Sequence, residues 1–433
     1  MITEAPFDTS LVTPGLLAAD MEGLAREFGT PLFVYDEDAL RARCREFVSA
    51  FGEHSVTYAS KAFLCRAMAK IVEEEGLGLD VATGGELFTA LSAGFPAERM
   101  VFHGNNKSDE EVRAGAMAGV GRFVVDSFDE IDRLERVFAE KPDDLFQLMN
   151  GAQVLVRVTP GVEAHTHEFI ETGTERSKFG FTVTDGVALA AVERVVKSAA
   201  LHFAGLHCHI GSQIERLDAY QRAIEILHDL AGEIDGTTGA SVEELNVGGG
   251  LCARYLADDP DVSVAEYANA LKTAVSSCWT NRGAPRLVVE PGRSIAAQCA
   301  ITLYRVGTIK EIPGVGTYVA VDGGMSDNPR PVLYGAGYEA YLPARVSEAR
   351  PLRCNVVGKH CEQGDVIVSG ACLPDGVQVG DLVATPATGA YGYSMASNYN
   401  KVPRPAVVFL SNDTPRLVVR RETNEDLVRF DLL

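Results

Sequence analysis

The sequence has no Cys-x-x-C pair, and its nine cysteines are an odd number spread over 433 residues. A disulfide framework usually contains an even number of cysteines, and structural zinc sites usually contain paired ones. We therefore expect neither disulfides nor structural zinc, and we predict a reducing, cytoplasmic setting.

Basic residues are scarce as well: 39 Lys and Arg face 60 Asp and Glu, which gives a formal net charge of −21. This charge disfavours nucleic acid and anionic membranes as partners, although a locally basic pocket could still hold a small anionic substrate. No apolar run approaches the length of a membrane-spanning helix. The first residues, MITEAPFDTSLVTPGLL, lack the basic and apolar regions of a signal peptide.

A short apolar strand, a polar or glycine-rich turn and a helical stretch alternate over most of the chain up to residue 292. Helical stretches include 109–120 and 220–232. The number of strands favours a closed, parallel (β/α)8 barrel over a doubly wound open sheet. The strand candidates are 57–62, 77–83, 100–105, 122–127, 154–160, 204–212, 244–250 and 286–292.

Past residue 292 the pattern changes to short β runs with turn signals and little helix, which indicates a second, mainly β domain. The run LFVYDE (32–37) has no helical stretch of the barrel pattern ahead of it and is a candidate for that domain too. We predict a barrel over 36–292 and a β-rich domain formed by 1–35 and 293–433.

The predicted strands end in polar residues, which is where barrel enzymes carry their chemistry. These residues are Lys61, Asp80, His103, Asn105, Asp126, Arg157, His207, His209, Glu290 and the glycines 248–250. Lys61 alone could be a surface lysine just outside the barrel mouth. The functional alternative is a Schiff-base lysine, whose amine becomes a nucleophile in a desolvated site.

The run NVGGGL (246–251) could be only a tight turn. After an apolar strand, however, Gly248, Gly249 and Gly250 would let backbone N–H groups approach a phosphate. The chain has no G-x-x-x-x-G-K-[ST] motif and no G-x-G-x-x-G followed by an acidic residue. A nucleotide is therefore the poorer candidate for that phosphate.

Glu290 could pair with Arg293, or it could bind a protonated heterocyclic nitrogen. His207 and His209 stand at i and i+2, so they should share one side of a strand; zinc is conceivable, but no suitably spaced third ligand follows. An imidazole could equally lie against a flat ring. A Schiff-base lysine, a phosphate cradle, a carboxylate and a stacking imidazole together are what pyridoxal 5'-phosphate requires.

Ten motifs, in this order along the chain, give it a resemblance to the diaminopimelate decarboxylases, a branch of the barrel-type (fold type III) pyridoxal-phosphate enzymes that include alanine racemase and eukaryotic-type ornithine decarboxylase. The resemblance covers about residues 30 to 410, and its one small departure, YASKAF, leaves the lysine in place. The motifs are YASKA, GLDVATGGEL, HGNNK, SKFGF, HCHIGSQI, NVGGGL, EPGRS, DGGMSDNPRPVLYGA, GKHCEQGDVI and GAYGYSMASNYN.

The resemblance implies roles for the cofactor-binding residues. Lys61 would hold the cofactor covalently and Asp80 would orient that lysine. His209 would stack on the ring, and Glu290 would keep the ring nitrogen protonated. The phosphate would be bound by Ser212, Gly248, Gly249, Gly250, Gly292, Arg293 and Tyr391.

For the substrate, the resemblance implies that Cys361 returns a proton to the α-carbon and that Glu362 holds the distal amine, both from the partner subunit of a homodimer. Arg293, Arg330 and Tyr334 would grip the distal carboxylate, and Tyr391 would also contact the substrate. His103, Asn105 and Arg157 receive no chemistry.

The resemblance predicts a carboxy-lyase that converts meso-2,6-diaminopimelate to L-lysine and CO2, the last step of lysine biosynthesis. Decarboxylation of ornithine, arginine or lysine is the alternative, but these substrates would leave Arg330 without a carboxylate to bind. A racemase would need a catalytic base on each face of the cofactor. A non-catalytic homologue would normally have lost Lys61 or Cys361, and both are present.

Overall fold

The computed structural model describes residues 5–140, 151–162, 177–280 and 283–433. The chain divides into two compact units, and each is described by itself. The barrel unit comprises Cys44–Cys252 and Val262–Gly292, and the sheet unit comprises Met1–Arg43, Ala253–Asp261 and Arg293–Leu433. No helix among the described residues has both the length and the apolar character that a membrane crossing demands.

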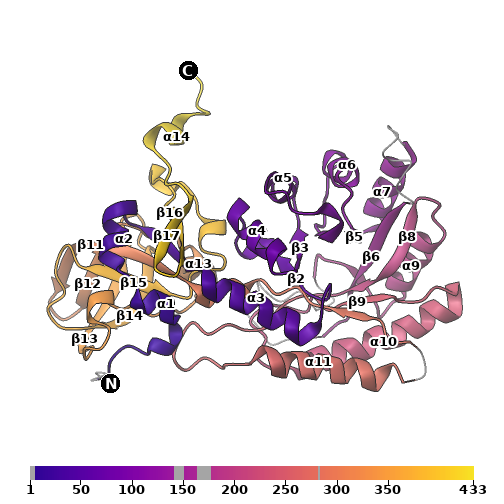
Figure 1. Ribbon diagram of the computed structural model, residues 1–433, viewed down its shortest axis with the longest axis horizontal. Helices are drawn as coiled ribbons and strands as arrows, with labels where there is room; N and C mark the ends of the chain where they lie inside the picture. Colours follow the sequence, from indigo (N-terminus) through magenta and orange to yellow (C-terminus); the bar gives the residue numbers. More distant parts are fainter. Residues whose placement is uncertain (1–4, 141–150, 163–176, 281–282) are drawn as a thin grey trace. The chain divides into compact units, whose positions relative to one another are not determined.

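The barrel unit is built on a parallel sheet whose strands follow the chain order (Figure 1). The last strand returns to the first, because Thr57 N donates to Val289 O (2.9 Å) and Val289 N donates to Ser55 O (3.0 Å). The predicted parallel barrel is therefore confirmed. Its strands are β2 (Thr57–Ala59), β3 (Gly78–Val81), β4 (Met100–Phe102), β5 (Arg122–Val125), β6 (Ala152–Thr159), β8 (Leu201–His207), β9 (Glu244–Asn246) and β10 (Arg286–Val288), and the short β7 (Phe181–Thr182) pairs with β6.

Helices connect these strands, and local signals in the sequence set their ends. In α6, Ser108 and Glu111 form a capping box at the start, and Gly119 ends the helix with a left-handed φ of 78°. The predicted helical stretches 109–120 and 220–232 correspond to α6 and α10. The helices are α4 (Arg66–Glu74), α5 (Gly84–Ser92), α6 (Asp109–Ala118), α7 (Phe128–Glu140), α9 (Val187–Val196), α10 (Asp218–Thr238) and α11 (Val264–Cys278), and α3 (Glu37–Phe51) begins in the sheet unit.

The sheet unit contains a mixed sheet that includes β1, as the sequence suggested. This strand runs antiparallel to β11 and parallel to β16. Two strands of this sheet, β13 and β17, were not predicted from the sequence. The second of them, β17, follows a turn with positive φ at Asn412 and Asp413. The strands are β1 (Leu32–Asp36), β11 (Ala300–Ile312), β12 (Gly316–Val321), β13 (Leu352–Val357), β14 (Val366–Leu373), β15 (Leu382–Pro386), β16 (Ala406–Ser411) and β17 (Thr414–Val419).

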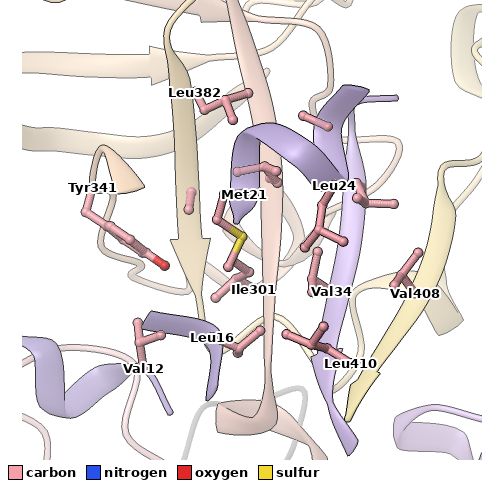
Figure 2. Close-up of a cluster of buried hydrophobic side chains, with 14 of the residues drawn as sticks. Val12, Leu16, Met21, Leu24, Val34, Ile301, Tyr341, Leu382, Val408 and Leu410 are labelled. Carbon is pink, nitrogen blue, oxygen red and sulfur yellow. The ribbon is translucent and has the colours of Figure 1, made fainter. Parts of the chain in front are cut away.

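Short helices cover one face of this sheet and close its hydrophobic core (Figure 2). The helix α2 (Met21–Phe28) buries Met21 and Leu24 against Val34 of β1 and Ile301 of β11, and Gly29 caps its end. Full burial of one such side chain contributes about 1.5–3 kcal/mol. The other helices of the unit are α1 (Pro14–Ala18), α12 (Arg293–Ala296), α13 (Arg330–Tyr334) and α14 (Asn424–Val428).

A buried ion pair fastens the ends of two barrel strands. The Lys107 ammonium pairs with Glu130 of α7 and donates to Gly104 O and Val124 O, each at 2.9 Å. The second oxygen of Glu130 accepts from Asp126 N at 2.8 Å. The lysine therefore ties the loop after β4 to β5 and α7.

We expect Glu130→Gln to lower the free energy of unfolding by about 3–5 kcal/mol, because it leaves the Lys107 ammonium buried without a counter-charge. Urea unfolding followed by circular dichroism measures the change. Glu193→Gln breaks the exposed Lys197–Glu193 pair and is the matched control, with an expected loss of at most about 1 kcal/mol. Equal losses in the two variants would contradict a structural role for the buried pair.

Candidate active site

A buried carboxylate, Glu290, follows the last barrel strand and receives hydrogen bonds from residues at the ends of three other strands. Glu290 Oε1 accepts from His103 Nε2 (2.9 Å) and Asn246 Nδ2 (2.7 Å), and Oε2 contacts His207 Nε2 (3.1 Å). Burial by itself would raise the pKa of Glu290, but the two histidines and their hydrogen bonds hold it well below its usual value. Glu290 is therefore an anion fixed in place by the ends of several strands.

The two histidines differ in charge. Burial lowers the pKa of His207 to about 4, so its imidazole is neutral near pH 7. His103 is also buried, yet Asp80, 3.4 Å away, and Glu290 raise its pKa above the usual value. Burial in turn raises the pKa of Asp80 to about 7, against the opposing charge of His103. His103, which was assigned no chemistry from the sequence, thus carries the positive charge between Asp80 and Glu290.

His103, His207 and Glu290 also lie close enough together to hold a metal ion, with ligand atoms within 4.8 Å of one another. The sequence analysis considered zinc on His207 and His209, but His209 is not part of this group of possible ligands among the described residues. Because β8 ends at His207, His209 follows the strand. In the structure the Nε2 atoms of His103 and His207 are both engaged with the Glu290 carboxylate.

Lys61 lies directly after β2, in a short 3-10 helix (Ser60–Ala62), and its side chain is exposed rather than buried. Its charge acts on Asp80 and on His209. Burial first, and then the charges of Lys61 and Arg157, hold the pKa of His209 well below its usual value. The structure therefore brings a flexible amine, a carboxyl group and a neutral imidazole to one end of the barrel unit.

The glycine run after β9 needs its glycines because the backbone is crowded there. A Cβ on Gly249 would lie 2.2 Å from Glu290 O, and Gly248 and Gly250 have φ of 70° and 117°. Gly248 N donates to Asn246 Oδ1 (2.9 Å). The N–H groups of Gly249 and Gly250 find no acceptor in the described part of the chain. Two fixed backbone donors of this kind suit an anion.

Two more predicted cofactor residues lie at strand ends of the barrel unit. Ser212 is half-buried in the loop after β8. Gly292 ends the unit, and a Cβ there would lie only 3.0 Å from Ala59 Cβ, at the end of β2. Arg157 is paired with Asp126 at 3.7 Å and lies over the Phe179 ring, which makes it a brace of the barrel end.

In the sheet unit, two buried arginines are surrounded by phenols. Arg293 Nη1 donates to Tyr255 OH (2.8 Å) and Arg330 Nη1 to Tyr338 OH (2.5 Å). Burial would raise the pKa of Tyr255, but the two guanidinium groups lower it overall. Arg330 is only 6% exposed, and no ion pair joins it to a carboxylate among the residues described. A buried cation in this state favours an anionic ligand.

The remaining predicted residues are also in the sheet unit. Tyr391, with a left-handed φ of 59°, lies under the Arg293 guanidinium at 4.6 Å. Tyr334 is half-buried at the end of α13. Cys361 and Glu362 are exposed in the loop between β13 and β14, and Cys361 is the exposed one among nine free cysteines.

Sequence reasoning missed Asn246, Tyr255 and Tyr338. Asn246 directly precedes the glycine run, and this position at a strand end could have marked it. Tyr255 gave no such signal, because its contact with Arg293 depends on Ala253–Asp261 joining the sheet unit. Tyr338 lies just past the DGGMSDNPRPVLYGA motif and was not marked by it.

Comparisons with known proteins agree with this geometry. Residues 37–297 match the family model "Pyridoxal-dependent decarboxylase, pyridoxal binding domain". The diaminopimelate decarboxylase of Mycobacterium tuberculosis is 51% identical over 420 residues, which cover 94% of this chain and 92% of that protein. The Bacillus subtilis enzyme of the same name is 48% identical over 94% of this chain and 93% of its own.

Solved structures give the same result. The diaminopimelate decarboxylase of M. jannaschii, in co-complex with L-lysine, superposes with a TM-score of 0.87 at 32% identity, covering 95% of this chain and 94% of that one. The chain belongs to the diaminopimelate decarboxylases, within the pyridoxal-dependent decarboxylase family.

Proposed function

We propose that this protein decarboxylates meso-2,6-diaminopimelate to L-lysine and CO2, the last step of lysine biosynthesis, with pyridoxal 5'-phosphate as cofactor. The observation that supports this substrate most directly is the buried pair Arg293 and Arg330. A guanidinium binds a carboxylate through two parallel hydrogen bonds, and diaminopimelate has a distal carboxylate to offer. Ornithine, arginine and lysine have none, so they would leave Arg330 buried without an anion.

The barrel unit fits the cofactor on four counts. Glu290 is an anion that can bind a protonated ring nitrogen, and His209 is a neutral flat ring. Gly249 and Gly250 present backbone donors for a phosphate, and Lys61 has an exposed amine for covalent attachment. When bound, the cofactor supplies a conjugated ring that accepts the electron pair left behind by CO2.

We also propose the family's roles for the other residues. Asp80 orients the Lys61 amine. Ser212, Gly248, Gly292, Arg293 and Tyr391 bind the phosphate together with the glycine run.

For the substrate, Arg330 and Tyr334 grip the distal carboxylate with Arg293, Tyr391 adds a further contact, and Glu362 holds the distal amine. Cys361 delivers the proton to the α-carbon after CO2 has left. We propose that Cys361 and Glu362 serve the site of the partner subunit, so that the active protein is a homodimer. Their exposure in the single chain supports this, since a thiol and a carboxylate that complete another subunit's site must lie at its surface.

We expect Arg330→Ala to lower kcat/KM for meso-diaminopimelate by about 10- to 200-fold, because losing a charged hydrogen-bond partner costs about 1.5–3 kcal/mol. Any CO2 release from L-lysine, which has no distal carboxylate, should be unaffected, and the cofactor absorbance should not change. CO2 release from diaminopimelate, lysine, ornithine and arginine, measured in parallel, tests both the variant and the proposed substrate. Arg345→Ala, at an Arg–Glu pair on the surface of the same unit, is the control. An equal loss with every substrate would make Arg330 structural.

We expect His103→Gln to move the acid limb of the kcat/KM profile to higher pH. His103 holds down the pKa of both Asp80, about 7, and Glu290, so without its charge both carboxyl groups take up protons at higher pH. The pH dependence of the cofactor absorbance should move in the same direction. His202→Gln, at an exposed position on β8, should leave both profiles unchanged. An unmoved acid limb would mean that His103 does not set these charges.

We expect Lys61→Ala and Cys361→Ala proteins, each inactive alone, to regain activity after mixing. In a mixed dimer one of the two sites has both residues intact, so about a quarter of the parental activity returns when half of the dimers are mixed. The Lys61→Ala protein should also lack the visible cofactor absorbance. Subunit exchange is confirmed by native mass spectrometry. Confirmed exchange without recovered activity would mean that each site is built from one chain.

A further inference from the structure

The loop that carries Cys361 and Glu362 is folded around a buried carboxylate. Asp365 Oδ1 accepts from Met325 N (2.7 Å), and its Oδ2 accepts from His360 N (2.8 Å). A Cβ on Gly324 would lie 2.6 Å from Asp365 Oδ1, and a Cβ on Gly358 would lie 2.2 Å from Asp365 Oδ2. Bare backbone at Gly324 and Gly358 therefore lets this carboxylate, at one end of the loop, hold His360 near the other end and Met325 of the segment after β12.

Between those ends, the backbone of Cys361 is held by one side chain from a distant part of the sequence. Asn400 Oδ1 accepts from Cys361 N (3.1 Å) and lies 3.3 Å from His360 Nδ1. Asn400 has a left-handed φ of 52°, a conformation that asparagine tolerates better than most residues. This backbone turn directs the amide toward the loop.

The hydrogen-bond pattern fixes which atoms donate. The Cys361 N–H is a donor, so the Asn400 atom facing it must be the oxygen. His360 Nδ1 faces the same oxygen and must donate to it, while His360 Nε2 lies 2.8 Å from the Ser326 hydroxyl, which can donate or accept. Each of these polar groups thus has a defined partner.

The neighbouring residue holds the other functional side chain of the loop. Tyr399 OH donates to Glu362 Oε2 (3.3 Å), and the Tyr399 ring lies beside the His360 ring, with centroids 5.4 Å apart. Residues 399–400 therefore contact both Cys361 and Glu362.

We propose that Asn400 is a positioning residue for Cys361: its amide oxygen sets the place of the Cys361 backbone, and through it the place of the thiol. The proposal rests on the proposed function, in which this thiol gives a proton to the α-carbon. The Cys361 side chain is exposed, so the backbone contact is what restrains it. Misplacing a reacting group by about 1 Å can cost about 100-fold in rate.

Two substitutions separate the hydrogen bond from the backbone conformation. Asn400→Gly keeps the left-handed φ but removes the acceptor, whereas Asn400→Asp keeps an acceptor oxygen in the same place. We expect Asn400→Gly to lower kcat by about 10- to 100-fold with a smaller change in KM, and Asn400→Asp to retain most of the parental kcat.

A second readout does not depend on catalysis. The rate at which iodoacetamide alkylates Cys361 in the holoenzyme, measured by peptide mass spectrometry, should change in Asn400→Gly and stay near the parental rate in Asn400→Asp. Cys372, in the same unit, is the internal reference and should react at an unchanged rate. His360→Ala, which removes the second donor to Asn400, should shift both readouts in the same direction and serves if Asn400→Gly does not fold.

Parental kcat and alkylation rate in Asn400→Gly would overturn the proposal. Equal losses in Asn400→Gly and Asn400→Asp would also overturn it, because the amide oxygen would then not be the group that matters. Failure of the proposed function gives a different result: Cys361→Ala would keep the parental kcat. The alkylation rates would then still decide whether Asn400 positions the thiol.

Discussion

The barrel unit depends on keeping one carboxylate charged inside a protein. A buried Glu290 without partners would take up a proton, because desolvation penalises its charged form. Three strand ends supply hydrogen bonds to it, from His103, Asn246 and His207, and one of these groups brings a positive charge. This demand explains why polar residues gather at the carboxyl ends of strands that are otherwise apolar.

In the sheet unit two buried charges are positive, and neutral phenols are among their partners. Arg293 and Arg330 are buried cations, and each donates a hydrogen bond to a phenol, Arg293 to Tyr255 and Arg330 to Tyr338. A phenol stabilises a guanidinium less than a carboxylate would, so Arg330 keeps its capacity to bind an anion. An internal Asp or Glu at this point would pair with the guanidinium and reduce that capacity.

The sequence allowed the barrel, its strands and the second domain to be predicted, because alternating strands and helices and their glycine caps are local patterns. Lys61, Glu290 and the glycine run could be named for the same reason, since each follows a recognisable strand. The hydrogen bond between His103 and Glu290 could not be predicted, because these residues are 187 positions apart in the chain. The sequence does not show how the closed barrel brings them together. Likewise, β17 was not predicted, although the two-residue Asn412–Asp413 turn before it is typical of a hairpin. Tyr255 was also missed, because its segment lies within the barrel sequence but belongs to the sheet unit.

The buried Lys107 has a consequence for chemical labelling. A reagent that modifies amines must reach the amino group, and Lys107, in the loop after β4, is only 1% exposed. Its amino group is also engaged by Glu130, Gly104 O and Val124 O, whereas the Lys61 side chain is exposed. The contacts that hold two strand ends together therefore also shield Lys107, and such a reagent should modify Lys61 while Lys107 stays unmodified.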